Sequence, residues 1–114
     1  MASMNLVTAC LLLLVAAALE AGGDALVRVG LHSPGTGARV GLLAAGAAVL
    51  LAYGVAVNSP PWDFGKLLGI YATLFFIVAQ VINLLVFHVR PSPPILVGGA
   101  LIAAGGLLIT FWRA

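Results

Sequence analysis

One acidic residue interrupts a long apolar segment near the N-terminus. Residues 4–19 carry no charge, Glu20 follows directly, and the apolar pattern resumes as far as Val27, broken once more by Asp24. A carboxylate inside a membrane span costs about 2.5–3.5 kcal/mol by insertion scales, so it marks a functional site by default. Glu20 is the sole glutamate of the chain, and it is the first candidate for chemistry.

Two further charged residues follow Glu20 at helical spacing. Asp24 and Arg28 lie four and eight residues on, so all three share one stripe of a helix. The helical rise places Asp24 about 6 Å and Arg28 about 12 Å further along the axis. Asp24 and Arg28 could pair and ease insertion of the helix end, or belong to a site with Glu20. Pairing explains Glu20 less well, because Arg28 is two turns away.

An embedded glutamate suits proton-coupled exchange. A low dielectric disfavours the charged carboxylate, so the group holds a proton until a cationic substrate stabilises the charge. Proton and cation then compete for one site, and two facing copies would titrate as a coupled pair. Gly22 and Gly23 follow directly, and their lack of side-chain bulk allows another helix to approach closely or the helix to bend.

Polar residues recur in a later apolar segment, and two interpretations of them stay open. They can form hydrogen bonds between helices, as such residues commonly do in membranes, or they can line a cavity with Glu20. A tyrosine there could donate a hydrogen bond to the carboxylate or stack on a cation, although tyrosines near interfaces often act as anchors. The candidates are Tyr71, Thr73, Gln80 and Asn83, with Tyr53 from the preceding segment.

The composition predicts an all-α integral membrane protein. Of 114 residues, 63% are hydrophobic and 7% charged, and the mean hydropathy is +1.22. Five basic residues are too few for a nucleic-acid footprint. Metal-ligand spacing and a nucleophile motif are both missing from the sequence, so we expect no metal, no cofactor and no enzymatic activity. The single Cys10 is expected to be a packing residue.

Four membrane spans are expected within a single domain, residues 1–114. Continuous apolar runs favour helices over barrel strands, which would alternate. Short connections imply that successive helices pack antiparallel. Polar and proline-containing segments bound the spans at about residues 5–29, 40–57, 67–89 and 94–112.

The charges between the spans give almost no orientation bias. Arg28, Arg39 and Arg90 fall on one side of the membrane, and Lys66 and Arg113 fall on the other. Because basic residues set topology, either the protein is weakly oriented with its first and third loops cytoplasmic, or it inserts both ways and forms an antiparallel pair.

The last span is rich in glycine. Gly98 and Gly105 lie seven apart, and Gly99, Ala103 and Gly106 form a second small-residue face. Such faces let helices touch closely, either within the chain or between two chains. The dimer interpretation assigns Gly98, Gly99, Gly105 and Gly106 to the contact.

The order of these motifs resembles the small multidrug resistance superfamily, and most closely its YnfA-type branch. The segment L-E-A-G-G around Glu20 resembles A-E-I-G-G of that branch. Tyr53-Gly54, Phe64-Gly65-Lys66 and Val89-Arg90-Pro91 resemble its Y-G, F-G-R and V-R-P motifs, and Gly98 and Gly105 match the glycine spacing of the dimerising fourth helix. The chain departs from the branch in Ala72-Thr73, in Phe87-His88 and in the second acid, Asp24.

The resemblance implies an antiparallel dimer of four-helix subunits in the inner membrane, either a homodimer or a heterodimer of paralogues. The two copies of Glu20 would line a shared cavity and exchange protons for small cationic substrates, with Tyr71 in the aromatic region of the third helix. Two other functions stay open. The chain could be a non-transporting subunit of a larger membrane complex, or one subunit of a flippase for lipid-linked substrates.

Overall fold

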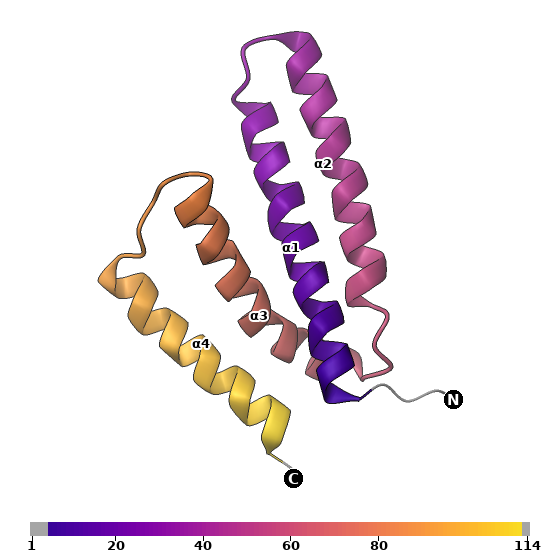
Figure 1. The fold of residues 1–114 in the computed structure, drawn as a ribbon, viewed down its shortest axis with the longest axis vertical. Helices are drawn as coiled ribbons and strands as arrows, with labels where there is room; N and C mark the ends of the chain where they lie inside the picture. The colour runs from indigo at the N-terminus through magenta and orange to yellow at the C-terminus, as the bar shows by residue number, and fades with distance from the viewer. Residues whose placement is uncertain (1–4, 113–114) are drawn as a thin grey trace.

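A computed structural model describes residues 5–112, and they form four α-helices joined by short loops. The helices are α1 (Leu6–Leu31), α2 (Thr36–Val57), α3 (Phe64–Leu85) and α4 (Pro93–Phe111), shown in Figure 1. All four are long and apolar enough to cross a membrane. The predicted all-α class with four membrane-spanning helices is confirmed; Arg113, which entered the charge comparison, lies outside the described residues.

Local sequence signals explain where the helices begin. The Asn5 side chain accepts a hydrogen bond from the Thr8 amide at 2.7 Å, which caps α1. Asp63 caps α3 in the same way, accepting from the Lys66 amide at 2.9 Å. These side chains satisfy amide groups that have no partner within the helix. Pro93 opens α4, where a missing N–H costs nothing.

The third helix starts and ends earlier than the predicted span of residues 67–89. Asp63 provides a cap that moves the start to Phe64, and α3 ends at Leu85. His88 then adopts a φ of 57°, in the left-handed region that few residues other than glycine enter. The Val89 amide donates to the Asn83 carbonyl at 3.0 Å, so the chain folds back over the helix end before the prolines begin.

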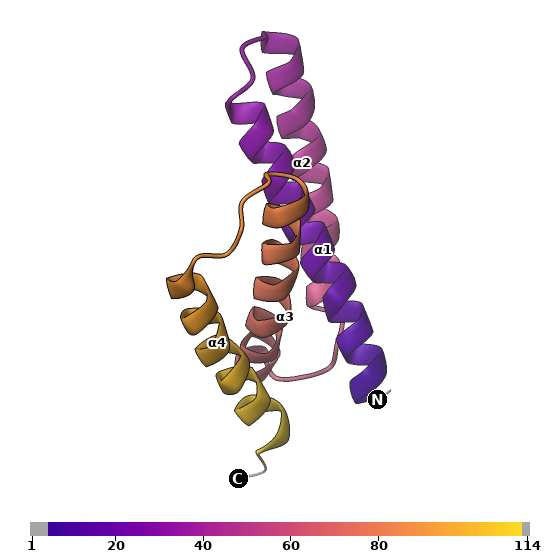
Figure 2. The same ribbon diagram turned by 60° about the vertical axis from the view of Figure 1, so that its left-hand side comes forward.

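The helices form two antiparallel hairpins, and α1 and α3 make most of the contact between them. α1 packs on α2, α4 packs on α3, and α1 packs on α3. The loops α1–α2 and α3–α4 point toward one end, and the α2–α3 loop and both chain ends toward the other (Figures 1 and 2). The buried core lies at the second end, where Leu13 and Ala17 of α1 meet Val57 of α2 and Ile70 of α3. Toward the first end the hairpins diverge.

A single chain leaves much apolar surface uncovered. Its radius of gyration is 15.9 Å, against about 13 Å for a compact globular domain of this length. The described part of α4 buries only Gly106 fully. Leu101 is 70% exposed and Leu51 73% exposed. Such surface is stable against lipid or against another protein chain.

Candidate functional site

Glu20 lies near the middle of α1 and is held by a residue from α3. The Tyr71 hydroxyl donates a hydrogen bond to Oε1 of Glu20 at 2.8 Å. Glu20 lies about 17 Å from the C-terminal end of a helix that is long and apolar enough to cross a membrane. Tyr71 is only 5% exposed and Glu20 is half-buried. Tyr71 thus donates a hydrogen bond to the carboxylate, which is one of the roles that the sequence suggested for it.

Two further aromatic rings lie close to Tyr71. The Tyr53 ring of α2 lies 5.8 Å from that of Tyr71, and the Phe75 ring of α3 lies 6.0 Å from it. Tyr71 and Phe75 are four residues apart and therefore share a face of α3. Sequence analysis did not select Phe75, although this spacing identifies it once Tyr71 is chosen. The acid thus lies beside a wall of three rings.

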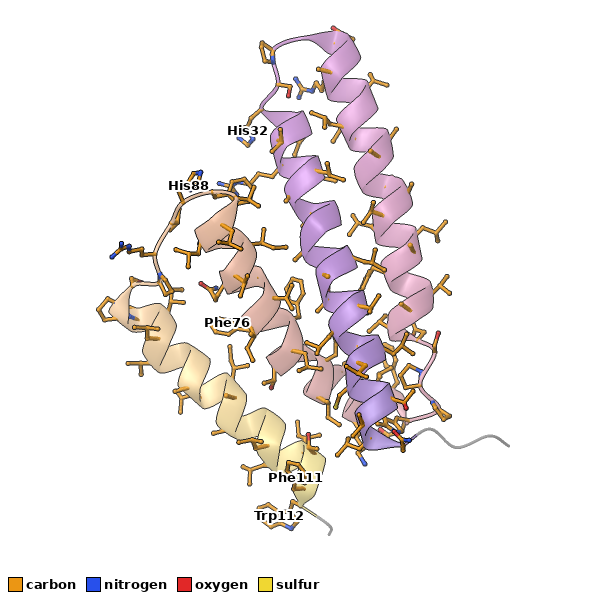
Figure 3. All side chains as sticks on the ribbon, in the orientation of Figure 1. His32, Phe76, His88, Phe111 and Trp112 are labelled. Atoms are coloured by element: carbon orange, nitrogen blue, oxygen red, sulfur yellow. The ribbon has the colours of Figure 1, made fainter. Side chains whose placement is uncertain are left out.

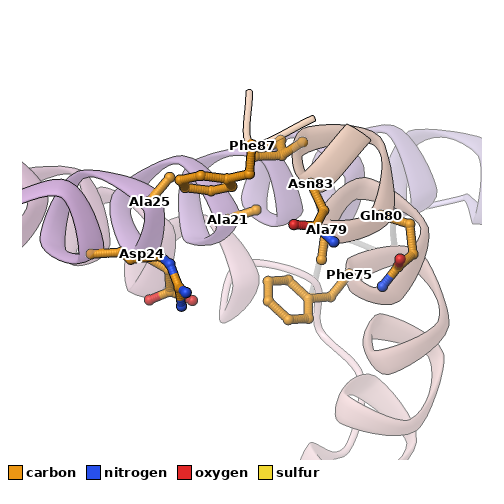
Figure 4. Close-up of a pocket in the computed structure, with 10 residues that line it drawn as sticks. Ala21, Asp24, Ala25, Phe75, Ala79, Gln80, Asn83 and Phe87 are labelled. Carbon is orange, nitrogen blue, oxygen red and sulfur yellow. The ribbon is translucent and has the colours of Figure 1, made fainter. Parts of the chain in front are cut away.

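A pocket of about 310 Å³ opens between α1 and α3, where the hairpins begin to diverge. Asp24 of α1 lines it together with Gln80 and Asn83 of α3, as Figure 4 shows. Phe75 also lines it, so the pocket adjoins the aromatic wall beside Glu20. The remaining lining residues are Ala21, Ala25, Arg28, Ala79, Ile82 and Phe87.

Arg28 interacts with an aromatic residue at the wide end of this pocket. Its guanidinium carbon lies 5.7 Å from the centre of the Phe87 ring, within cation–π range. The His32 ring contacts the Arg28 carbonyl at 2.8 Å and so belongs to the same helix end. Figure 3 shows His32 beyond the end of α1 and His88 in the loop between α3 and α4. Phe87 follows the end of α3, and no spacing rule in the sequence could connect it with Arg28.

Thr73 makes a hydrogen bond to the fourth helix. Its hydroxyl donates to the Ile102 carbonyl of α4 at 3.1 Å, because residue 73 lies on the side of α3 that faces the fourth helix. Thr73 therefore follows the other interpretation, a hydrogen bond between helices. Gln80 and Asn83 line the pocket between α1 and α3.

The glycines of α4 fall into two pairs with different surroundings. A Cβ atom on Gly99 would meet the Phe76 ring at 2.8 Å or closer, and one on Gly106 would overlap Thr73. These two glycines pack against α3 of the same chain. Gly98 and Gly105 have open space at the Cβ position. Of the four glycines predicted for a dimer contact, only Gly98 and Gly105 therefore have room beside them for a second chain.

The two glycines that follow Glu20, Gly22 and Gly23, also have different surroundings. A Cβ on Gly23 would lie 2.8 Å from Leu50 of α2, and one on Gly46 would lie 2.7 Å from Val27 of α1. These residues bring the first hairpin together beside the acid. Gly22 faces open space.

Comparison with known proteins supports the membrane-protein class. A UPF0060 membrane protein of Herpetosiphon aurantiacus is 32% identical over 69 residues, which cover 59% of this chain and 63% of the relative. The match thus spans less than two thirds of the relative's length. No family model and no solved structure matches the chain. The likeness is consistent with the resemblance to YnfA-type proteins, and together with the four apolar helices it indicates a multi-pass membrane protein.

Proposed function

We propose that the protein is a proton-coupled exporter of small cationic molecules, with Glu20 as the common site for proton and substrate. The observation that carries this proposal is the Tyr71–Glu20 hydrogen bond inside an apolar bundle. A hydroxyl donor favours the ionised carboxylate, and the surrounding lipid favours the neutral acid. A group balanced in this way can release its proton when a cation arrives.

The surroundings of Glu20 suit a cationic substrate. The rings of Tyr53, Tyr71 and Phe75 offer faces on which a cation can stack. The adjoining pocket carries Asp24 and provides the volume of a small molecule. In this scheme the substrate reaches Glu20 along the diverging end of α1 and α3.

A dimer in the inner membrane completes the proposal. The open arrangement of the two hairpins leaves the Glu20 region accessible on one side, and a second copy would close it. Gly98 and Gly105 offer α4 a flat face for that contact. The near balance of basic residues between the two sides agrees with oppositely inserted copies.

Uptake into liposomes under a pH gradient tests the proposal. We expect the wild-type protein to drive proton-linked movement of tetraethylammonium, guanidinium or tyramine, and we expect Glu20→Gln to abolish it. Asp63→Asn is the matched control, because it removes a carboxylate at a helix start where asparagine caps equally well. Undiminished uptake by Glu20→Gln would exclude the mechanism. An inactive wild-type protein that co-purifies with a stoichiometric foreign membrane protein would support the accessory-subunit function.

A further inference from the structure

The pocket beside Glu20 contains both signs of charge. Asp24 brings a carboxylate and Arg28 a guanidinium, both from the exposed side of α1. The amides of Gln80 and Asn83 stand on the α3 side and can donate as well as accept hydrogen bonds. The walls between them are apolar, formed by alanines and by the Phe75 and Phe87 rings.

A substrate that is only a cation gains nothing from Arg28. Like charges repel, and the repulsion grows where the pocket excludes water. Arg28 nevertheless lines the same pocket as Asp24, and it also lines a neighbouring pocket with Asn83 and Phe87. A compound with an anionic group beside its cationic group would change this repulsion into attraction.

Phe87 holds Arg28 in a position suited to such a compound. The guanidinium lies over the ring at 5.7 Å. A guanidinium that stacks on an aromatic ring keeps its in-plane N–H groups available for a carboxylate. Arg28 and Asp24 are one turn apart, about 6 Å along the helix, which matches the two charges of a small amino acid bound between flexible side chains.

We propose that the substrate class is a small zwitterion, with its cationic group on Asp24, one helical turn from Glu20, and its anionic group on Arg28. This inference rests on the proposed function for the role of Glu20, and it adds Arg28 as the residue that selects the anionic group. Gln80 and Asn83 would bind the remaining polar atoms. Phe87 is a positioning residue, since it acts through Arg28.

Binding of matched compounds to the purified full-length protein tests this selection without requiring transport. Tyrosine and tyramine differ only in a carboxylate, as do lysine and cadaverine. Calorimetric titration in a non-ionic detergent should give the carboxylate-bearing member an affinity about tenfold higher. Arg28→Gln should bring each pair to nearly equal affinity. Arg39→Gln, which removes an arginine outside this pocket, should keep the preference.

Four results would overturn the zwitterion proposal. The amines could bind as tightly as the amino acids, or the preference could survive in Arg28→Gln. Loss of Arg28 could also weaken both members of a pair equally, as expected if it serves only to pair with Asp24. Competition by added phosphatidylethanolamine would assign the site to a lipid headgroup and would likewise exclude a soluble substrate.

The proposed function fails in a different way. If it is wrong, the uptake assay gives no proton-linked flux for any cation, whatever the binding preference. If only the zwitterion inference is wrong, amines are transported in a Glu20-dependent manner and Arg28→Gln does not alter their selection. The two failures are therefore distinguishable.

Discussion

The phenolic oxygen of Tyr71 lies 2.8 Å from a carboxylate oxygen of Glu20, although 51 residues separate them in the chain. Tyr71 belongs to the buried core, and its hydrogen bond to Glu20 joins α1 to α3 between the two hairpins. Tyr53 and Val57 of α2 also pack against α3 there, so this hydrogen bond is one of several contacts between the hairpins.

Removing the Tyr71 hydroxyl should weaken the binding of cations at Glu20. Tyr71→Phe keeps the buried ring and deletes the donor to the carboxylate. The carboxylate that faces the cation then has one charge-assisted hydrogen bond fewer. We expect the affinity for a cationic probe to fall about tenfold, as the loss of such a hydrogen bond implies.

Tyr53→Phe is the control for this loss of affinity. The Tyr53 ring lies 5.8 Å from that of Tyr71, and its hydroxyl is not the donor in the Tyr71–Glu20 hydrogen bond. The affinity of this variant for the probe should stay close to that of the wild type. An unchanged affinity in Tyr71→Phe would show that the hydrogen bond to Glu20 does not support cation binding.

Thr73 should affect stability and leave proton coupling unchanged. Thr73→Val removes the hydrogen bond to the Ile102 carbonyl. Hydrogen bonds of this kind between membrane helices contribute about 0.6 kcal/mol on average. Unfolding in mixed micelles should register a loss of this size, while the pH dependence of cation binding stays at its wild-type value. A changed pH dependence of cation binding in Thr73→Val would show that Thr73 takes part in the Glu20 site.

The contrast between Tyr71 and Thr73 shows what the sequence can predict about this site. Four apolar spans and one embedded acid predict the class and select Glu20 without any structure. The side of α3 that meets α1 depends on how the hairpins pack, and residues 71 and 73 point to different neighbours. Asn83 and Gln80 line the same pocket as Asp24, and Glu20 is not among the residues that line it.

Other features were outside the reach of sequence reasoning for a similar reason. Gly98 and Gly99 are adjacent in the chain, yet one faces open space and the other packs on Phe76. Phe87 meets Arg28 because α3 ends at Leu85 and His88 turns the chain back. Such contacts depend on the exact rotation and end of a helix, which a hydrophobic run does not fix.

Adjacent glycines of α4 should respond differently to the same substitution. Gly106→Ala places a methyl group against Thr73 and should destabilise the α3–α4 hairpin by about 1–3 kcal/mol. Gly105→Ala adds the same methyl group in open space and should leave the stability of the chain unchanged. Gly105→Leu should weaken dimers in chemical cross-linking. Equal stability losses at positions 105 and 106 would contradict the packing described for α4.

Dual insertion can be measured by labelling a loop position from each side of the membrane. Ser92 is exposed in the α3–α4 loop, and its side chain makes no capping hydrogen bond. In a Cys10→Ala background, Ser92→Cys should react with an impermeant maleimide from both sides in similar amounts. Two added lysines beside Lys66 should shift the ratio strongly toward one side. Labelling from one side only, before any charge is added, would exclude the antiparallel pair.

Proton release on ligand binding tests the central role of Glu20 most directly. Purified protein in weakly buffered detergent is mixed with tyramine, guanidinium or tetraethylammonium, and the pH of the solution is followed. We predict that at least one cation releases protons from the wild-type protein and from Asp63→Asn, with an amplitude that falls as the starting pH rises. Glu20→Gln should release none. Proton release of wild-type size from Glu20→Gln would contradict the account.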